Sequence, residues 1–213
     1  MRINMDSEFT IFHICNKSIA NFNIFSATSH SERFLWTLDY YRRNSKTKLS
    51  VEIRKKRYEY LNLLEYSSSS QVKILAYCIM PDHYHLLLKA PEFNFISQFI
   101  NNIQNSYTRY FNLKHKRKGP LWQSRFRRVR VESDSQLLHL SRYIHINPTT
   151  SKLVMVPEDW QFSSYRDIIS SEHYLKNILT EISIRKPTLY KQFVDNQIDY
   201  QRKLKAIKRS LLE

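Results

Sequence analysis

The stretch VKILAYCIMPDHYHLLLK, residues 72–89, decides the fold, because two apolar segments flank a short turn sequence. Residues 72–80 form an apolar run that predicts a buried strand. Residues 80–83 (MPDH) place proline and aspartate at the two central positions of a tight turn. Residues 83–89 then run back as a second strand, so the stretch predicts a hairpin.

The segments around this hairpin predict two more strands and several helices. Strands are predicted at residues 9–15 (FTIFHIC) and 125–131 (RFRRVRV). Helices are predicted at residues 29–41, at residues 50–66 and from a capping Asn94 to about Asn112. The resulting order β-α-(α)-β-β-α-β is that of the split βαβ, ferredoxin-like fold, an α+β class with an antiparallel sheet.

One further helix follows this unit. Residues 133–136 (SDSQ) have the spacing of a capping box, and the helix that they open is predicted to end near Pro148. The chain beyond Trp160 is also predicted to be helical. We therefore expect a main domain over residues 1–168 and a helical, basic C-terminal extension over residues 169–213.

The charge of the chain points to a polyanionic partner. The 213 residues hold 34 Lys and Arg against 19 Asp and Glu, a formal net charge of +15. Nucleic acid is the leading candidate, and charge alone does not separate DNA from RNA. A solvated basic surface is the simpler alternative. An anionic membrane face is disfavoured because no strongly amphipathic, basic, Trp/Phe-rich helix is evident. The basic residues gather in three groups: Lys114, Lys116, Arg117 and Lys118; Arg125, Arg127, Arg128 and Arg130; and Arg202, Lys203, Lys205, Lys208 and Arg209.

Composition also predicts the compartment. No apolar run approaches the roughly 18–20 residues that a bilayer span needs. The N-terminal MRINMDSEFT carries acidic residues where a signal peptide has an apolar stretch. Cys15 and Cys78 both lie in apolar segments, which favours reduced thiols over a disulfide scaffold. We expect a cytoplasmic protein with no membrane association.

Two histidines of the hairpin are candidate metal ligands. His83 and His85 are two residues apart, so both imidazoles leave one face of the strand, while Tyr84 points to the other face. Two neighbouring ring nitrogens form a partial site for a divalent metal. Taken alone, the pair is more simply interpreted as core or hydrogen-bonded histidines.

The helix after residue 134 carries a polar edge beside its apolar stripe. His139, Tyr143 and Asn147 follow one another at i, i+4 and i+8, which places a phenol and a carboxamide side by side. Tyr143 alone is also typical of an amphipathic aromatic edge, and Asn147 could simply end the helix before Pro148.

These groups together suggest a reaction on a phosphodiester. A phenol is a weak nucleophile unless it is activated, and a metal held by His83, His85 and a third ligand could neutralise the phosphate charge. Asn147 could complete the ligand set with an oxygen. A mixed nitrogen and oxygen site suits Mn²⁺ or Mg²⁺, and the two histidines favour Mn²⁺. A structural zinc site is disfavoured because no cysteine pair has zinc spacing.

A basic, aromatic segment is the candidate nucleic-acid contact. Trp and Arg side chains can stack on bases and pair with phosphates. The alternative is a strand edge with solvated arginines. The candidate DNA-binding residues are Trp122, Gln123, Arg125, Arg127, Arg128 and Arg130, with Lys116 and Arg117 before them.

Several motifs in this order resemble the HUH single-tyrosine transposases, particularly the REP-associated tyrosine transposases. They are AYCIMPDHYHLLL (residues 76–88), SYTRYFN (106–112), LWQSRFR (121–127) and RYIHINP (142–148). The similarity extends over roughly residues 9–168 and includes the element SSY at residues 163–165. The chain departs from the family in its loops, which usually contain several glycines, because Gly119 is its only glycine.

The resemblance implies a fold, a substrate and a set of roles. His83-Tyr84-His85 matches the HUH motif, Tyr143 matches the nucleophile, and Asn147 matches the polar ligand four residues later. It implies a ferredoxin-like fold, single-stranded DNA substrates with hairpins and a 5′-phosphotyrosine intermediate. Related enzymes act as monomers or as dimers, so either a monomer or a homodimer is expected.

Two other functions stay open at this point. A non-catalytic module on the same fold could bind single-stranded DNA or RNA hairpins through its aromatic residues, and an RNA-binding regulator is the third candidate. Other titratable side chains are interpreted as packing residues, and they are Tyr77, Tyr107, Tyr110, His13 and His139.

Overall fold

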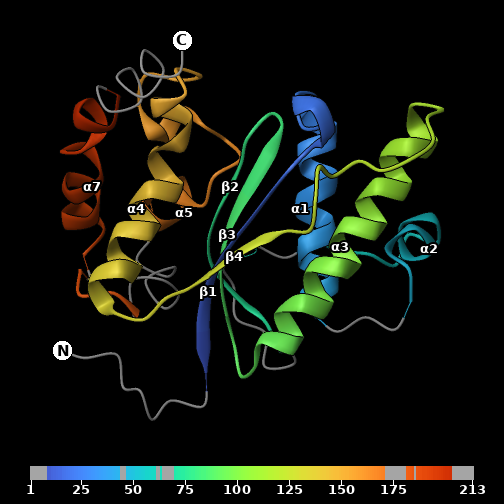
Figure 1. The fold of residues 1–213 in the computed structure, drawn as a ribbon, viewed down its shortest axis with the longest axis horizontal. Coiled ribbons are helices and arrows are strands. Elements are labelled where there is room, and N and C mark those ends of the chain that lie inside the picture. The colour runs from blue at the N-terminus through green and yellow to red at the C-terminus, as the bar shows by residue number, and fades with distance from the viewer. Residues whose placement is uncertain are drawn as a thin grey trace.

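The protein folds around a four-stranded antiparallel sheet with the strand order β2-β3-β1-β4 (Figure 1). The computed structural model describes residues 9–43, 47–60, 63, 70–170, 181–184 and 186–202. The strands are β1 (Thr10–Lys17), β2 (Lys73–Ile79), β3 (His83–Ala90) and β4 (Arg127–Arg130). The predicted α+β class and ferredoxin-like order of elements are confirmed.

The hairpin of residues 72–89 lies at one side of this sheet. β2 and β3 pair antiparallel, and the turn between them is closed by the Met80 amide, which donates to the His83 carbonyl at 2.8 Å. β3 then pairs with β1, so Cys15 lies opposite His85 and Lys17 opposite His83. Because directly paired residues of an antiparallel sheet share a face, this register gathers side chains of both central strands on one surface.

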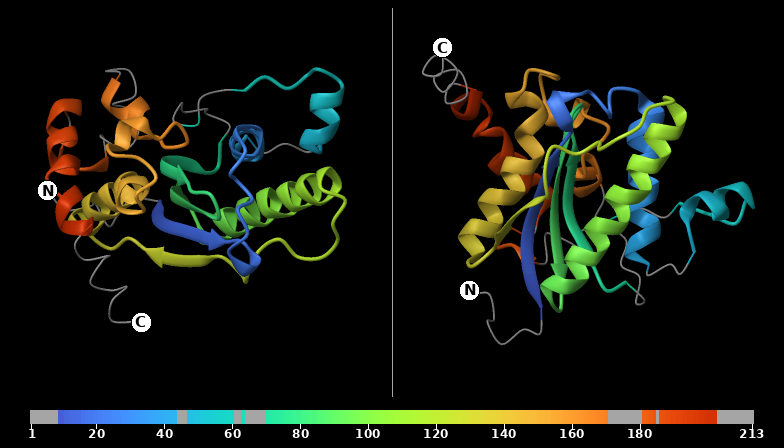
Figure 2. Two further views of the ribbon diagram at one scale, coloured as in Figure 1. Left: turned by 90° about the horizontal axis from the view of Figure 1, so that it is seen from above. Right: turned by 45° about the vertical axis from the view of Figure 1, so that its right-hand side comes forward.

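Helices cover both faces of the sheet (Figure 2). One face is covered by α1 (Thr28–Arg42) and α3 (Phe93–Lys114), which pack on each other, while the short α2 (Leu49–Arg54) lies to their side. The other face is covered by α4 (Asp134–Thr150), α5 (Tyr165–Ser170) and α7 (Pro187–Asp195). Two 3-10 turns, η1 (Ile19–Asn21) and η2 (Pro157–Asp159), complete the described elements.

An aromatic core fills the space between the sheet and the α1/α3 layer. The ring of Phe34 lies 5.1 Å from those of Tyr84 and Tyr107, measured between centroids. All three side chains are fully buried. The Tyr107 hydroxyl donates to the Ile24 carbonyl at 2.8 Å, so the predicted packing role of this tyrosine is confirmed.

The predicted start of α4 is confirmed in atomic detail. The Ser133 hydroxyl accepts a hydrogen bond from the Gln136 amide at 3.1 Å, which satisfies one unpaired donor of the first turn. The Gln136 side chain in turn accepts from the Glu132 amide at 2.8 Å. These bonds fix where the helix that carries Tyr143 begins.

Three predicted boundaries are wrong. The helix expected at 50–66 ends at Arg54, since Lys56 takes a left-handed backbone conformation with a φ of 54°. Beyond it, the Tyr58 hydroxyl donates to Asp39 of α1 at 2.9 Å. Helix α3 begins at Phe93 with Glu92 in the capping position, so Asn94 lies inside the helix. Strand β4 is shorter than residues 125–131.

Helix α4 ends at Thr150, near Pro148 as predicted, and includes Pro148 in its last turn. A proline there removes a single amide donor, and the residues after it keep helical bonding. The Ser151 amide donates to the Asn147 carbonyl at 3.0 Å, and the Thr150 hydroxyl donates to the same oxygen at 3.0 Å.

The segment around the SSY element covers the outer edge of β2. The Ile79 amide donates to the Phe162 carbonyl at 2.9 Å, and the Ser164 amide donates to the Tyr77 carbonyl at 3.0 Å. An edge strand with unpaired amides is prone to pair with other chains, and these bonds remove that exposure.

The predicted C-terminal extension contributes a helix to the core. Tyr190 and Val194 of α7 are fully buried, and α7 packs on α4 and α5. The basic residues Lys203, Lys205, Lys208 and Arg209 lie outside the described residues. Within the described ranges, no helix combines the length and apolar character that a bilayer span requires.

Candidate active site

The two histidines of the HUH motif lie side by side on one face of β3. The centroids of the His83 and His85 rings are 5.0 Å apart. Tyr84 points to the opposite face, where it is fully buried and its hydroxyl accepts from the Gln104 amide at 2.7 Å. Because side chains alternate along a strand, Tyr84 anchors β3 in the core on one face, and His83 and His85 lie on the other face at the candidate site.

Asp82 orients the first histidine. Its carboxylate lies 2.5 Å from Nδ1 of His83 and 3.2 Å from Nζ of Lys17. Burial raises the pKa of Asp82, but the hydrogen bonds and charges of His83 and Lys17 outweigh it and bring that pKa below its ordinary value. An ionised carboxylate accepts a hydrogen bond from Nδ1–H, and in that tautomer the lone pair of His83 is on Nε2.

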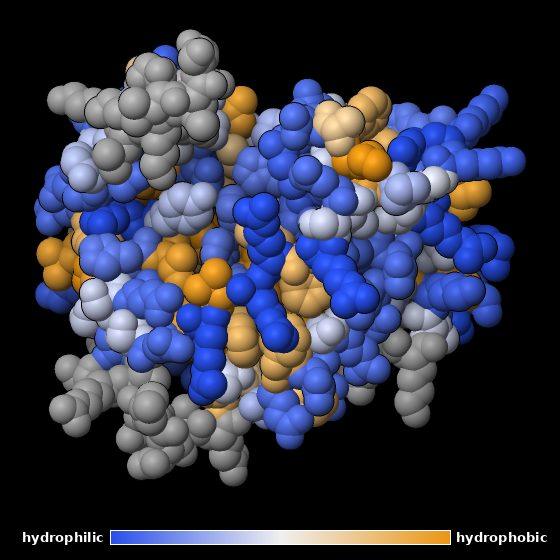
Figure 3. Space-filling view, viewed as in Figure 1, coloured by the Kyte–Doolittle hydropathy of each residue, from blue (hydrophilic) through white to orange (hydrophobic). Residues whose placement is uncertain are grey.

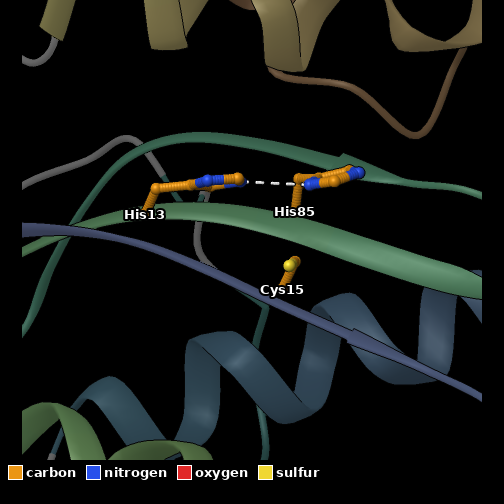
Figure 4. Close-up of side chains that lie close together, drawn as sticks. All are labelled: His13, Cys15 and His85. Carbon is orange, nitrogen blue, oxygen red and sulfur yellow. Dashed lines mark hydrogen bonds between the residues drawn. The ribbon is translucent and has the colours of Figure 1, made fainter. Parts of the chain in front are cut away.

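A third histidine orients the second. His13 Nε2 and His85 Nδ1 are 3.0 Å apart, and both side chains are buried. Figure 4 draws the hydrogen bond between the two rings. Burial lowers the pKa of His13 to about 4. Burial, with smaller effects from His83 and His13, holds the pKa of His85 well below its ordinary value. Both rings are therefore neutral near pH 7, the protonation state that metal binding requires.

Tyr143 lies over this pair of rings. Its ring is edge-on to that of His85 at 5.5 Å and to that of His13 at 6.2 Å, between centroids. The side chain is 44% exposed, so its hydroxyl is open to a large substrate. The structure therefore brings Tyr143 close to the HUH strand, as expected, although the two segments are far apart in the sequence.

Asn147 lies one helical turn after Tyr143 on α4. It is buried, and its amide nitrogen donates to the Tyr143 carbonyl at 3.5 Å. This bond uses the nitrogen end of the carboxamide and turns the oxygen, its potential ligand atom, the other way. Helix α4, which carries Asn147, packs on β2 and β3.

A buried hydrogen-bond network, which the sequence analysis missed, holds α4 in place. His145 is fully buried, with Nδ1 2.7 Å from the Tyr190 hydroxyl of α7 and Nε2 2.9 Å from the Ser164 hydroxyl. Tyr190 also donates to the Ser141 hydroxyl at 3.0 Å. Burial lowers the pKa of His145 to about 3, so the imidazole is neutral and can both donate and accept.

We expect Tyr190→Phe to lower the free energy of unfolding by about 1–3 kcal/mol, because it leaves Nδ1 of the buried His145 without its partner and removes the bond to Ser141. Urea unfolding followed by circular dichroism measures the change. Tyr200→Phe is the matched control, since that side chain is 56% exposed and should change stability little. Equal stability of the two variants would contradict an energetic role for the network.

The arginines of β4 divide between the two faces of the sheet. Arg127 pairs with Cys15, whereas Arg128 and Arg130 pair with Ile14 and Phe12. Arg127 therefore shares the face of the histidines, and the other two point to the α3 side. The Arg128 guanidinium lies 4.0 Å from the centre of the Phe93 ring. All four β4 residues are exposed, and strongly hydrophilic side chains cross the face of the molecule over this strand (Figure 3).

The other candidate DNA-binding residues differ in environment. Trp122 is partly buried, its ring lies 5.5 Å from that of Tyr84, and its indole donates to the Gln104 carbonyl at 3.4 Å. Arg117 bonds the Asn112 side chain at 2.8 Å. These positions favour packing roles for both. The remaining three candidates are exposed, and they are Lys116, Gln123 and Arg125.

His13 and Cys15 were not predicted as site residues. Their ligand atoms and one of His85 lie within 4.8 Å of one another, so the three could hold a soft metal ion. Burial raises the pKa of the Cys15 thiol, and the charge of Arg127 opposes that shift. By contrast, His139 is exposed, lies 2.8 Å from the Arg142 guanidinium and approaches the Phe193 ring of α7.

The fold and the sequence together place the chain among the transposases. The model of the family described as "Transposase IS200 like" matches residues 26–147, more than half of the chain, and the chain belongs to this family. The matched range includes the hairpin, α3, β4 and α4 up to Asn147. The resemblance inferred from the motifs is confirmed.

Two particular relatives are similar to the chain. It is 30% identical over 110 residues to a protein of Haemophilus influenzae named "Putative REP-associated tyrosine transposase", covering 47% of this chain and 62% of that protein. It thus spans less than two thirds of the relative's length. The fold is similar to "Structure of the REP associates tyrosine transposase bound to a REP hairpin", with a TM-score of 0.51, 20% identity and coverage of 76% of this chain and 79% of the other.

Proposed function

We propose that this protein is a metal-dependent transesterase that cleaves and rejoins single-stranded DNA through Tyr143. The observation that carries the proposal is the contact of Tyr143 with His85, with ring centroids 5.5 Å apart. Tyr143 is 44% exposed while His85 is buried beside it, so a phenol that a large phosphodiester substrate can reach lies next to an imidazole. Membership of a transposase family supports the same reaction class.

His83, His85 and Asn147 are the proposed metal ligands. The residues fit an Mg²⁺ or Mn²⁺ ion, because the Nδ1 atoms of both histidines already face Asp82 and His13, which leaves their Nε2 atoms as the remaining nitrogen donors. Such an ion, when bound, would neutralise charge on the phosphate and act as a Lewis acid. The carboxamide oxygen of Asn147 adds the harder ligand that these ions favour.

In the proposed cleavage step, Tyr143 is the nucleophile. Its Oη forms a bond to phosphorus as the bond from phosphorus to the 3′-oxygen breaks. The phenol loses its proton and the departing oxygen gains one, so the products are a 5′-phosphotyrosine and a free 3′-hydroxyl. Attack on this linkage by the 3′-hydroxyl of another strand restores the phenol and joins DNA with no external energy source.

The proposed substrate is single-stranded DNA that carries a hairpin. The net charge of +15 favours a polyanion. Of the exposed arginines of β4, Arg127 lies on the same face of the sheet as the candidate site. The similar solved structure is described as bound to a REP hairpin, which supports this substrate class. A single chain supplies every proposed catalytic group.

We expect the affinity for hairpin DNA to fall with salt and to depend on β4. Replacing Arg127, Arg128 and Arg130 by alanine should weaken binding and make the slope of log K against log salt shallower by about 2, at roughly 0.7 per lost phosphate contact on single strands. Fluorescence anisotropy over a salt series measures both effects.

The control for this experiment removes the same charge elsewhere. Alanine at Lys48, Arg54 and Lys55 changes three exposed basic residues around α2, which lies away from β4 in Figure 1. The two triple variants could show the same loss of affinity and the same change in the slope of log K against log salt. In that case only the overall charge determines DNA binding, and β4 is not a DNA-contact surface.

Covalent capture tests the proposed function itself. The protein is incubated with hairpin-bearing single-stranded DNA and Mn²⁺ or Mg²⁺, and an adduct that survives SDS is expected. DNA binding without any adduct under these conditions would favour the non-catalytic binding module instead.

A further inference from the structure

We infer that His13 is a positioning residue that fixes the tautomer of His85 so that its Nε2 lone pair is available to the metal. The inference deepens the proposed function, on which it rests, and assigns a role to a side chain outside the HUH motif. His13 lies on β1, 72 residues away from His85 in the sequence.

The sheet places the two imidazoles in contact. His13 pairs with Leu87 and Cys15 with His85, so His13 is the diagonal neighbour of His85 on the same face. The two rings are inclined by only 17°, with centroids 5.2 Å apart. The atoms that meet are Nε2 of His13 and Nδ1 of His85, at 3.0 Å, a hydrogen-bond distance (Figure 4).

A hydrogen bond between two neutral imidazoles holds one proton between the facing nitrogens. Either His85 donates Nδ1–H to His13, or His13 donates Nε2–H to His85. In the first state the lone pair of His85 is on Nε2, where it can bind a metal. In the second state Nε2 carries a proton and cannot do so. The role of His13 is to accept the Nδ1 proton and so stabilise the first state.

The neighbouring histidine has the same arrangement with a different acceptor. Asp82 contacts Nδ1 of His83 at 2.5 Å, as His13 contacts Nδ1 of His85. Both rings of the motif therefore meet their partners through Nδ1, and both present Nε2 as the remaining nitrogen. Partners of this kind orient metal-binding histidines and typically contribute 10–100-fold to metal affinity.

A competing arrangement uses the same three residues differently. His13, Cys15 and His85 could bind an ion directly, with His85 ligating through Nδ1. A thiolate favours soft ions such as Zn²⁺, whereas the Mg²⁺ or Mn²⁺ of the proposed reaction favours nitrogen and oxygen. The two arrangements differ in what Cys15 does, and this difference can be measured.

The test compares His13→Ala, His13→Gln and Cys15→Ser in the full chain. Binding of Mn²⁺ alone is followed from the electron paramagnetic resonance signal of the free ion. We expect His13→Ala to weaken Mn²⁺ binding by roughly 10–100-fold. His13→Gln, which keeps an acceptor near the position of Nε2, should restore most of it, and Cys15→Ser should leave it unchanged.

A second measurement needs neither metal nor activity. Long-range ¹H–¹⁵N spectra of the metal-free protein report which nitrogen of His85 carries its proton. The wild-type protein should show His85 protonated on Nδ1, and His13→Ala should move the population toward Nε2–H. Because the wild-type spectrum is itself informative, the test does not depend on how well a variant folds.

The outcomes separate this inference from the proposed function. The inference would be overturned if His85 were protonated on Nε2 in the wild-type protein. It would also be overturned if His13→Ala left the Mn²⁺ affinity unchanged. Loss of Mn²⁺ binding in Cys15→Ser would favour direct ligation instead and overturn it too. If the wild-type protein binds no Mn²⁺ yet shows the expected tautomer, the hydrogen bond is as inferred and the metal-dependent function is what fails.

Discussion

Replacing Tyr143 by phenylalanine is expected to abolish the covalent protein–DNA adduct while hairpin DNA still binds. The substitution removes only the hydroxyl oxygen, which is the proposed nucleophile. The side chain is 44% exposed, so its loss should change stability little. Adduct formation is measured on denaturing gels with labelled DNA, and binding is measured by anisotropy.

The control is a tyrosine elsewhere on the surface. Tyr110 of α3 is partly buried and its hydroxyl lies 3.2 Å from Nζ of Lys114, so Tyr110→Phe is an equally small change. This variant should retain the adduct. An adduct that survives Tyr143→Phe would place the nucleophile at another residue.

The second large effect is expected at the HUH histidines. His83→Ala or His85→Ala should reduce metal-dependent cleavage by roughly a thousandfold or more, because metal stabilisation of a transition state is worth several kcal/mol. Chelation of the metal should have the same effect on the wild-type protein. Initial rates of strand cleavage over a series of Mn²⁺ concentrations measure the loss.

His139→Ala is the matched control for the histidine variants. His139 lies on α4 one turn before Tyr143, but it is exposed and contacts Arg142. Its replacement should leave the dependence on Mn²⁺ unchanged. Undiminished metal-dependent cleavage in His83→Ala would contradict the ligand assignment, and metal-independent cleavage by the wild-type protein would contradict the metal itself.

Local signals predicted most of the fold. The apolar run of residues 72–80, the MPDH turn and the alternation at His83, Tyr84 and His85 depend on neighbouring residues, and each is found as expected. The same holds for the capping box at Ser133 and for the spacing of Tyr143 and Asn147, since both are properties of one helix. Order and spacing of motifs sufficed to identify the family.

The parts that the sequence could not predict depend on strand register and long-range packing. His13 meets His85 only because β1 pairs with β3 in one particular alignment. The division of the β4 arginines between two faces likewise follows from how β4 pairs with β1. Tyr58, in the segment after α2, bonds to Asp39 of another helix. None of these partners is near in sequence, so no local pattern reveals them.

The bond pattern of His145 has a consequence for cooperativity. One imidazole connects the α4 backbone that bears it to Tyr190 of α7 on one side and to Ser164, beside β2, on the other. Local unfolding of α7 would remove the buried hydrogen-bond partner of His145 on α4. We therefore expect the two helices to open together rather than separately. The position of Tyr143 above His85 is therefore coupled to the docking of residues almost fifty positions later in the chain.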